Sequence, residues 1–426
     1  SNSSAASDVY KRQGMSGDAP VGAWAGDVRA AALAHIGRAI VSSGARLAEQ
    51  PRSVLRRDEI VWGRAPARLD VGGGWTDTPP YSLEWGGRVI NAAVTLNGQP
   101  PIQAYARMID EPVVRIASID LGARIEITEL DDLLDYAHDV SEFGLTKAAL
   151  ALSGLSPETA PWPRGASLRD MLAQFGGGIE LTTLAAIPKG SGLGTSSIMG
   201  AVICAVVQRV MGRPRTRQEL FHDVLRLEQA LTTGGGWQDQ IGGAVDGVKV
   251  IATEPGLVPD ASIQYVPSDV LDPRRNGGQT LLYYTGITRL ARNILQQVVG
   301  RYLCRDRVAM DTLTRLRRVV GDVADALSRK DLAAFGRLVD VVWELNKRLD
   351  PGSTNDEVEA LLARVRPYVY GAKLLGAGGG GFVLMVCRSP RDAARVRSML
   401  EAEPPNDLAR FFEFAISRSG LVVTAC

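Results

Sequence analysis

The fold of this chain is decided by the stretch IPKGSGLGTSSI, which runs from Ile187 to Ile198. Gly190, Gly192 and Gly194 alternate with small or apolar residues, and three hydroxyl residues then open a run with helical spacing. Glycine lets the backbone approach phosphate oxygens, and the first turn of a helix offers unpaired N–H groups and the positive end of its dipole. The stretch therefore predicts a phosphate-binding loop before a helix; a tight loop with a Ser or Thr cap is the plainer alternative.

This loop is not a Walker A motif, because no GK[ST] follows, and it is not a GxGxxG fingerprint. Its hydroxyl groups can donate to phosphate or ligate Mg²⁺, and its lysine can neutralise charge. The nucleotide-binding residues that we predict are Lys189, Gly190, Ser191, Gly192, Leu193, Gly194, Thr195, Ser196 and Ser197.

A second glycine-rich stretch, LTTGGGWQDQ (Leu231–Gln240), follows a helical pattern. Asp239 comes directly after a triple glycine, Trp237 and a glutamine, where the chain could wrap a ligand. Glu228, on the preceding helical run, is the natural second carboxylate, although it could also be a solvated helix charge beside a plain loop. Because all three histidines lie outside these motifs, a carboxylate is the expected base.

Two further glycine-rich stretches complete the pattern. APARLDVGGGWTDTPP (Ala65–Pro80) joins a strand that carries Arg68 to a turn that presents Asp77. That pair suits either sugar hydroxyl recognition or a structural ion pair. LLGAGGGGFV (Leu374–Val383) runs into a strand and predicts close backbone packing or a loop around a ligand.

The composition narrows the class of protein. At 426 residues the chain exceeds the ~250–300 residues at which a single core usually stops growing, so we expect two lobes. The net charge of +1 gives no basic field for nucleic acid or an anionic membrane. The four cysteines lack metal-binding spacing, which favours a reducing cytoplasm, and no apolar run reaches transmembrane length.

The N-terminus is interpreted separately. Ser1–Gln13 looks like a translated sequencing adapter, with a natural disordered tail as the alternative, and is excluded from fold reasoning. The remaining chain is divided into a helical extension over 14–57, an N-terminal lobe over 58–255 and a C-terminal lobe over 256–426. Within the extension, an alanine-rich surface helix is expected over 27–47, with Asp27 as its N-cap.

Hydrophobic periodicity predicts an α+β protein with a strand-rich first half and a helix-rich second half. The expected strands, of which the first five should form a sheet through largely local connections, are Ile60–Trp62, Val89–Val94, Ile102–Ala106, Val113–Ile116, Ile125–Ile127, Ile179–Leu184, Leu281–Tyr284, Phe382–Val386 and Phe411–Ile416. The expected helices are Phe143–Ser153, Ser167–Phe175, Ser196–Met211, Arg217–Thr232, Thr288–Cys304, Met310–Ser328, Leu332–Leu349, Asp356–Tyr368 and Pro390–Glu403.

In this order the glycine motifs resemble those of the GHMP superfamily of small-molecule kinases, which includes galactokinases, homoserine kinases and mevalonate kinases. The resemblance covers about Asp58 to the C-terminus. GGWTDTPP (Gly73–Pro80), LTTGGGWQDQIGG (Leu231–Gly243) and YTGITRLARN (Tyr284–Asn293) are most similar to the L-fucose kinases, then to the D-glycero-D-manno-heptose 7-phosphate kinases. The resemblance implies a two-lobe α+β fold with the active site between the lobes. It also implies that the enzyme uses ATP and Mg²⁺.

The resemblance also implies roles for individual residues. Asp239 matches the catalytic base toward the anomeric sugar hydroxyl, and Arg68 matches the arginine that stabilises the transferring phosphoryl group. Ser196 and Glu228 match Mg²⁺ ligands of the mevalonate kinase branch, with Thr195 and Ser197 as alternatives to Ser196. The expected substrate-binding residues are Trp75, Asp77, Trp237, Gly378 and Gly379.

The implied reaction converts L-fucose and ATP to L-fucose 1-phosphate and ADP. In some L-fucose kinases a nucleotidyl-transferase domain precedes the kinase, so such a domain is an expected upstream neighbour in the natural gene. Galactokinases place Glu-His where Gly74-Trp75 stand here, which argues against galactose. The alternatives are a heptose 7-phosphate kinase or another anomeric sugar kinase, and an inactive sugar or nucleotide sensor. A phosphorylated acceptor would need a basic cluster, for which Arg64, Arg88 and Arg107 are candidates.

Overall fold

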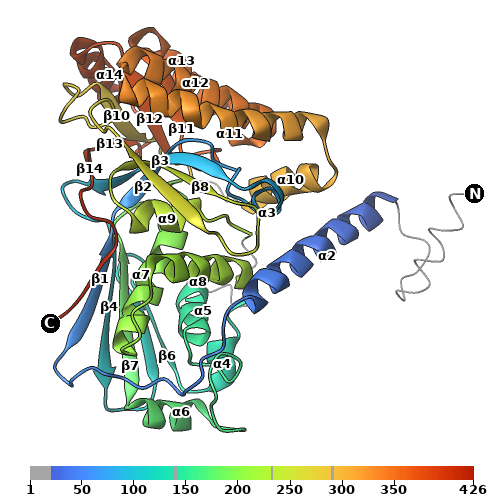
Figure 1. Cartoon of the computed structure of the whole chain (residues 1–426). Helices are drawn as coiled ribbons and strands as arrows, with labels where there is room; N and C mark the ends of the chain where they lie inside the picture. Colours follow the sequence, from blue (N-terminus) through green and yellow to red (C-terminus); the bar gives the residue numbers. More distant parts are fainter. Residues whose placement is uncertain (1–20, 138–142, 232–233, 289–291) are drawn as a thin grey trace, which may run out of the picture.

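The computed structural model describes residues 21–137, 143–231, 234–288 and 292–426, which form two lobes (Figure 1). The expected mixed α and β content is confirmed. Ser1–Gln13 and the end of the expected Arg217–Thr232 helix lie outside the described residues, as do 289–291 of the expected Thr288–Cys304 helix. The other expected helices and strands are present with ends that differ by a few residues, except for the helix over 27–47 and the strand over 411–416.

The first lobe is built on two sheets. One has the strand order β15 (Val422–Ala425), β1 (Ile60–Ala65), β4 (Ile102–Ile109), β7 (Gly178–Ala185), β5 (Val114–Ser118) and β6 (Ala123–Ile127). The other has the order β14 (Phe414–Ile416), β3 (Arg88–Leu96), β8 (Val248–Thr253) and β9 (Ala261–Val266), with β2 (Ala67–Gly72) also paired to β3. The expectation of a sheet with largely local connections is wrong, because β1 pairs with β4 and β15 while β3 joins the other sheet.

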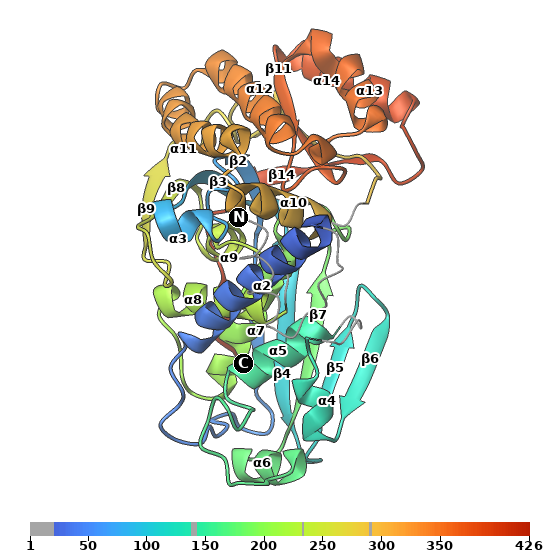
Figure 2. The same cartoon turned by 90° about the vertical axis from the view of Figure 1, so that its right-hand side faces the viewer.

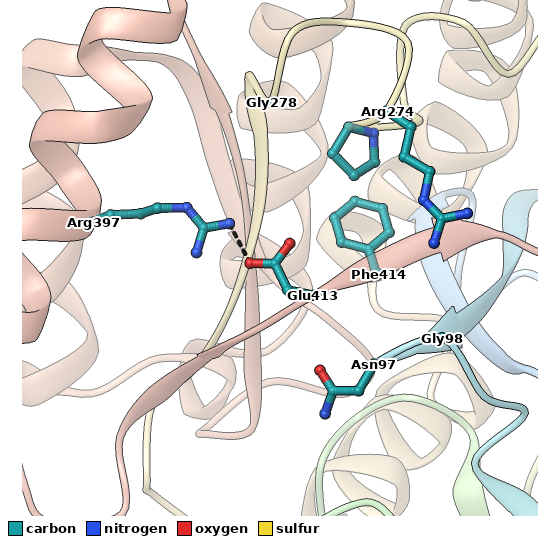
Figure 3. Close-up of a pocket in the computed structure, with 8 residues that line it drawn as sticks. Asn97, Gly98, Arg274, Gly278, Arg397, Glu413 and Phe414 are labelled. Carbon is teal, nitrogen blue, oxygen red and sulfur yellow. Dashed lines mark ion pairs between the residues drawn. The ribbon is translucent and has the colours of Figure 1, made fainter.

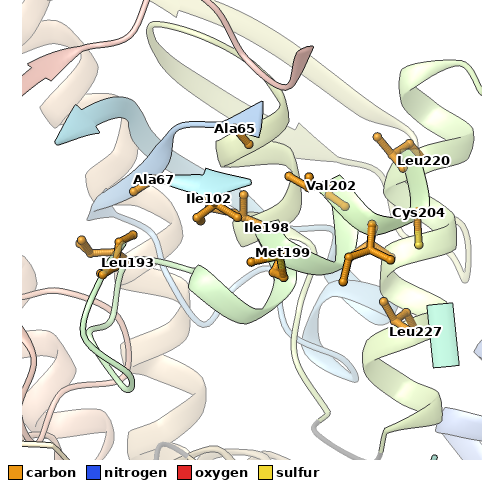
Figure 4. Packing of buried hydrophobic residues seen from close by; sticks show 14 of the residues in the cluster. Ala65, Ala67, Ile102, Leu193, Ile198, Met199, Val202, Cys204, Leu220 and Leu227 are labelled. Atoms are coloured by element: carbon orange, nitrogen blue, oxygen red, sulfur yellow. The ribbon is translucent and has the colours of Figure 1, made fainter. Parts of the chain in front are cut away.

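Helices cover these sheets. α7 (Thr195–Val210) packs on β1 and β4, and its neighbours are α5 (Gly144–Leu152), α8 (Arg217–Ala230) and α9 (Gln238–Ala244). Smaller helices in the lobe are α3 (Tyr81–Trp85), α4 (Leu130–Leu134) and α6 (Leu168–Phe175). α7 is apolar on most sides, since it lies between the sheet and α8, and Figure 4 shows its buried Ile198 and Val202 against Ala65 and Ile102.

The second lobe combines one sheet with the helices of the second half of the chain. The sheet order is β11 (Val369–Leu374), β12 (Phe382–Cys387), β10 (Thr280–Tyr284) and β13 (Arg410–Phe412). The helices of this half of the chain are α10 (Arg292–Leu303), α11 (Arg307–Ser328), α12 (Leu332–Leu349), α13 (Asp356–Val365) and α14 (Pro390–Ala402). α11 and α12 also contact β2, so they bridge to the first lobe.

The end of the chain returns to the first lobe. The segment expected as one strand at Phe411–Ile416 is two strands in different sheets, β13 beside β10 and β14 beside β3. The last strand, β15, then pairs with β1. The lobe boundary at residue 255 stays a prediction; these two final strands follow it and pair with strands that precede it.

The extension contains one long helix, α2 (Val21–Ser42), which runs along α8 (Figure 2). The prediction that this helix begins at Asp27 and reaches Leu47 is wrong: the helix already includes Val21, the first described residue, and ends at Ser42. Ile40 is fully buried, and Arg226 of α8 donates to the Val41 carbonyl at 3.0 Å. The C-terminal end of α2 is therefore anchored to the helix that carries Glu228.

Candidate functional site

The predicted phosphate loop precedes α7 as expected. Gly190, Gly192 and Gly194 all have positive φ, of 65°, 76° and 75°, which only glycine adopts readily. Gly194 is the N-cap of α7, and its carbonyl accepts the Ile198 N–H at 3.0 Å. The N–H groups of the first helical turn therefore point toward this loop, while the buried Leu193 side chain fixes it to the core (Figure 4).

The last glycine-rich stretch packs directly on this loop. A Cβ on Gly192 would lie 2.2 Å from the Leu375 carbonyl oxygen, and a Cβ on Gly376 would lie 2.8 Å from the Gly192 Cα. The Phe382 N–H also donates to the Ser191 carbonyl at 3.1 Å. The close packing predicted for this stretch is confirmed.

Gly378 and Gly379, predicted to bind substrate, lie against the turn that follows α12. The Gly379 N–H donates to the Ser353 carbonyl at 2.5 Å, and a Cβ on Gly378 would lie 2.3 Å from the same oxygen. Close backbone packing is therefore sufficient to explain why these two positions are glycine. A contact between them and the sugar stays a prediction.

Arg68 and Asp239, 171 residues apart in the sequence, meet beside the phosphate loop. The Arg68 Nε and Nη2 atoms donate to Asp239 Oδ1 at 2.8 and 2.6 Å, and Nη1 donates to the Gly192 carbonyl at 2.8 Å. Burial opposes the charge of Arg68, yet Asp239 and Asp70 raise its pKa above the ordinary value. Arg68 is thus a buried cation that joins the carboxylate to the phosphate loop.

Asp77 lies at the entrance of α9, next to Asp239. The Gln238 backbone N–H donates to Asp77 Oδ2 at 3.1 Å, and a Cβ on Gly236 would lie only 2.1 Å from that oxygen. Burial, together with the charge of Asp239, raises the pKa of Asp77 to about 7. The triple glycine therefore leaves room for the Asp77 carboxylate beside α9, whereas the sequence predicted Glu228 as the second carboxylate of this motif.

One ion pair of the site was not predicted. Lys373, on β11, donates to Asp70 Oδ2 at 3.0 Å and to the Asp70 carbonyl at 2.9 Å, and both side chains are buried. Asp70 lies two residues after Arg68 on β2, and alternation along a strand places both on one face. That spacing is the sequence signal for Asp70; Lys373 had none, because the strand β11 was not expected.

Glu228, a predicted metal ligand, receives a hydrogen bond at 2.7 Å from the Ser197 hydroxyl. Both side chains are buried, whereas Ser196, the other predicted ligand, is exposed. The structure thus brings Glu228 to Ser197, the named alternative. Within the described residues, no group of three or more His, Cys, Asp or Glu side chains could hold a metal ion.

The two tryptophans predicted to face the sugar have different surroundings. Trp237 is 2% exposed and packs with Val89, Phe221 and Ile241 in a small apolar cluster, which favours the packing role over a sugar contact. Trp75 is half-buried and has a φ of +76°, which is strained for a bulky residue. Trp75 is therefore the better candidate for a ligand contact.

A hollow of about 610 Å³ lies elsewhere, between the β3–β4 turn, α14 and the segment that joins β13 to β14 (Figure 3). Its charged lining includes Arg397 and Glu413, which form an ion pair at 2.8 Å, and Arg274. None of the predicted site residues lines this hollow. In the described part of the chain, no helix is long and apolar enough to cross a membrane.

The glycine-rich loop at a helix N-terminus and the two-lobe α+β fold agree with the match to known families. Residues 165–247 match the N-terminal domain of GHMP kinases, and residues 323–406 match their C-terminal domain. The chain belongs to the GHMP kinase family. A heptose 1-phosphate kinase from Bacteroides thetaiotaomicron has the same fold, with a TM-score of 0.60 at 19% identity over 85% of this chain and 98% of that one.

Within the family, this chain is similar to two bifunctional proteins. An L-fucokinase/L-fucose-1-P guanylyltransferase from Bacteroides fragilis is 42% identical over 88% of the chain. A bifunctional fucokinase/GDP-fucose pyrophosphorylase from Arabidopsis thaliana is 34% identical over 80% of the chain. The chain spans 39% and 31% of the length of these relatives.

Proposed function

We propose that this chain is an ATP-dependent sugar 1-kinase that converts L-fucose to L-fucose 1-phosphate. The observation that carries the proposal is the Arg68–Asp239 pair, which joins a carboxylate to the phosphate loop through the Gly192 carbonyl. The similarity to the two fucokinase-containing relatives supports fucose as the sugar. We further propose that the reaction takes place in the cytoplasm.

The chemistry asks for positioning and charge stabilisation more than for covalent steps. Both bonds from Arg68 end on Oδ1 of Asp239, so Oδ2 is the oxygen that would accept the proton of the anomeric hydroxyl. The attacking oxygen then reaches the γ-phosphorus of ATP as the bond to the leaving ADP breaks. Arg68 and the N–H groups of the first turn of α7 would stabilise the charge on the transferring group.

The residues near the phosphate loop suit Mg²⁺. Glu228 supplies a carboxylate and Ser197 a hydroxyl within one hydrogen bond of each other, and oxygen donors are those that this hard cation prefers. When bound, Mg²⁺ would neutralise phosphate charge. We propose Glu228 with Ser197 or Ser196 as the protein ligands.

The sugar would lie between Asp77 and Asp239, with the Trp75 indole as an apolar neighbour for the C5 methyl group. Discrimination by such an apolar contact is modest, about 1–3 kcal/mol per group, so related sugars should retain some activity. Hydrogen bonds to the ring hydroxyls would discriminate more strongly, because an unmatched buried polar group costs affinity.

A heptose 7-phosphate acceptor is less well supported. Of the three arginines considered for its phosphate, Arg107 pairs with Glu180 at 2.6 Å and Arg64 lies over the Trp62 ring at 4.6 Å. Arg88 extends toward Gly321 of α11. Of the three, Arg107 is therefore already paired with a carboxylate.

The proposal is tested by measuring kcat/KM with ATP and Mg²⁺ for L-fucose, D-arabinose, D-galactose and D-glycero-D-manno-heptose 7-phosphate. We expect L-fucose to be used best and D-galactose much less well. A preference for the phosphorylated heptose would contradict the fucose assignment, and the absence of ATP consumption with every sugar would favour a sensor instead of a kinase.

A further inference from the structure

The ion pair between Asp70 and Lys373 connects the two lobes beneath the site. Asp70 belongs to β2, which pairs with β3 of the first lobe, while Lys373 belongs to β11 of the second lobe. Lys373 is 0% exposed and Asp70 is 3% exposed. The lysine binds both the Asp70 carboxylate and its carbonyl, so it holds the side chain and the backbone of β2 together.

Asp70 and Lys373 are each close in the sequence to residues of the predicted site. On β2, Arg68 lies two residues before Asp70 on the same strand face and carries the contact to Asp239. Directly after β11, Leu375 and Gly376 follow Lys373 by two and three residues and pack on Gly192 of the phosphate loop. Asp70 is therefore close in the sequence to Arg68, and Lys373 is close in the sequence to the residues that pack on the phosphate loop. The ion pair connects these two parts of the site.

The charged groups around Asp70 keep its carboxylate ionised. Burial favours the neutral acid at Asp70, yet Lys373 and Arg68 lower its pKa, so the carboxylate stays ionised between the two cations. Asp70 Oδ1 has no hydrogen-bond partner among the described residues. A buried ion pair with an unmatched oxygen contributes little net stability, because desolvation offsets the attraction. Its value lies in fixing one arrangement of the groups around it.

Gly74 supplies the space that this carboxylate occupies. A Cβ at position 74 would lie 2.9 Å from Asp70 Oδ2, the oxygen that Lys373 binds. A side chain at position 74 would therefore force the Asp70 carboxylate or the backbone of the turn to shift.

We propose that Asp70 and Lys373 are a positioning pair that ties the lobes together and holds Arg68 against Asp239 and the phosphate loop, with Gly74 as the residue that makes room for it. The proposal deepens the proposed kinase function and rests on it wherever sugar turnover is the readout. Neither residue of the pair touches the reacting atoms, so both act through Arg68 and the loop.

The first test compares Asp70→Asn, Lys373→Met and the double variant in the full chain, with L-fucose, ATP and Mg²⁺. Each single variant should have a lower melting temperature, because it leaves a buried partner unmatched. The double variant should regain most of the melting temperature while kcat stays at least about tenfold below that of the parent chain. A double variant with parental kcat would overturn the positioning role.

The pH profile provides a separate readout of the Asp70 charge at the sugar site. The charge of Asp70, like that of Asp239, raises the pKa of Asp77. Asp70→Asn should therefore shift the acidic limb of kcat/KM for the sugar to lower pH, provided that the ionised Asp77 binds the sugar. An acidic limb that keeps its position in Asp70→Asn would contradict a link between the Asp70 charge and the sugar site, whereas kcat of the double variant decides on the positioning role.

The second test uses Gly74→Ala, which should displace the Asp70 carboxylate and lower both kcat and the melting temperature. In an Asp70→Ser background the same alanine has no carboxylate to collide with, so its further cost should be much smaller. Gly321→Ala is the matched control, because only Arg88 lies within 4 Å of that position. Equal effects of Gly74→Ala in both backgrounds would refute the steric link.

The two proposals fail in different ways. If the parent chain phosphorylates none of the sugars, the proposed function fails. The melting-temperature coupling between Gly74→Ala and Asp70→Ser needs no substrate and then decides on the ion pair alone. If the parent is active and the couplings are absent, the kinase assignment stands and the positioning pair is wrong.

Discussion

At the scale of single residues, the orientation of the Asp239 carboxylate is the feature most open to a direct test. Arg68 holds one oxygen of Asp239 with two hydrogen bonds. Asp239→Asn keeps the shape of the side chain but removes its capacity to accept a proton. We expect turnover to fall by roughly 10²–10⁴-fold, the usual range for a positioned acid or base.

Nucleotide affinity should survive in Asp239→Asn, because ATP is proposed to rest on the loop over 190–197. Isothermal titration with a non-hydrolysable ATP analogue measures that affinity separately from turnover. Asp322→Asn, at an exposed carboxylate on α11, serves as the control. Near-parental turnover in Asp239→Asn would remove this residue from the role of base.

Asp77 gives a prediction about pH and stability. Its pKa is about 7 in the folded chain and near 3.9 when unfolded, so the native state holds a proton that the unfolded state releases between about pH 4 and 7. The buried carboxylate therefore destabilises the fold progressively over that window, and fully above it. Asp77→Asn removes this cost.

We expect Asp77→Asn to raise the melting temperature clearly at pH 8 and by a smaller amount at pH 5, while it weakens sugar binding. Thermal denaturation at the two pH values, without ligands, checks the first part. An equal change at both values would mean that Asp77 does not titrate in this range. A lower KM for the sugar would argue against its role as a sugar-binding carboxylate.

Single residues also mark the limits of prediction from the sequence. The roles of Arg68, Asp77 and Asp239 were implied by the resemblance to known kinases, whereas the contact between Arg68 and Asp239, 171 residues apart, came only from the structure. Lys373 could not be found in this way, because a lysine inside a short apolar run gives no hint of a partner 303 residues away. Trp237 was predicted to face the sugar, yet its burial depends on tertiary packing that no local pattern encodes.

At the scale of elements, helices were easier to predict than sheets. α6 and α8 begin at capping boxes, Ser167 with Asp170 and Thr216 with Glu219, and such local signals are legible in the sequence. The sequence also predicted the strand β1, but it did not predict which strands pair with β1. Pairing depends on which strands meet after long excursions of the chain, so the sheet order came only from the structure.

The first turn of α7 yields a prediction about Mg²⁺. Ser196 and Ser197 are neighbours, but successive positions on a helix point in different directions, and Ser197 is the one that bonds Glu228. Glu228→Gln should raise the Mg²⁺ concentration needed for half-maximal turnover more than it raises KM for the sugar. The same comparison for Ser196→Ala and Ser197→Ala identifies the hydroxyl ligand.

Mg²⁺ titrations of turnover at saturating ATP and sugar make this measurement. The serine variant whose curve shifts with that of Glu228→Gln supplies the ligand. Curves for all three variants that overlay the parent would mean that the metal is held elsewhere.

At the scale of the whole molecule, the N-terminal extension is attached to the kinase body. Ser43 Oγ lies 2.8 Å from His222 Nε2, and the Arg226 guanidinium fills the space beside Gly44. Removing Ser1–Gln13 should leave melting temperature and activity unchanged. Removing residues 1–43 should lower the melting temperature, because Ile40 no longer covers α8 and Arg226 loses the Val41 carbonyl.

Differential scanning calorimetry of the two truncated chains checks this contrast. Arg226→Met in the full chain is the companion variant, since it breaks the same contact without removing residues. A fall in melting temperature on removal of Ser1–Gln13 alone would contradict the interpretation of that segment as foreign sequence.

The return of the chain to the first lobe also limits when this lobe can fold during synthesis. β14 and β15 lie beside β3 and β1, strands that a ribosome produces more than 300 residues earlier. Until those last strands emerge, β3 and β1 each lack one neighbour and present unpaired backbone groups. These backbone groups stay unpaired until residues 414–425 have been made. The first lobe can therefore complete its two sheets only after this late segment has left the ribosome.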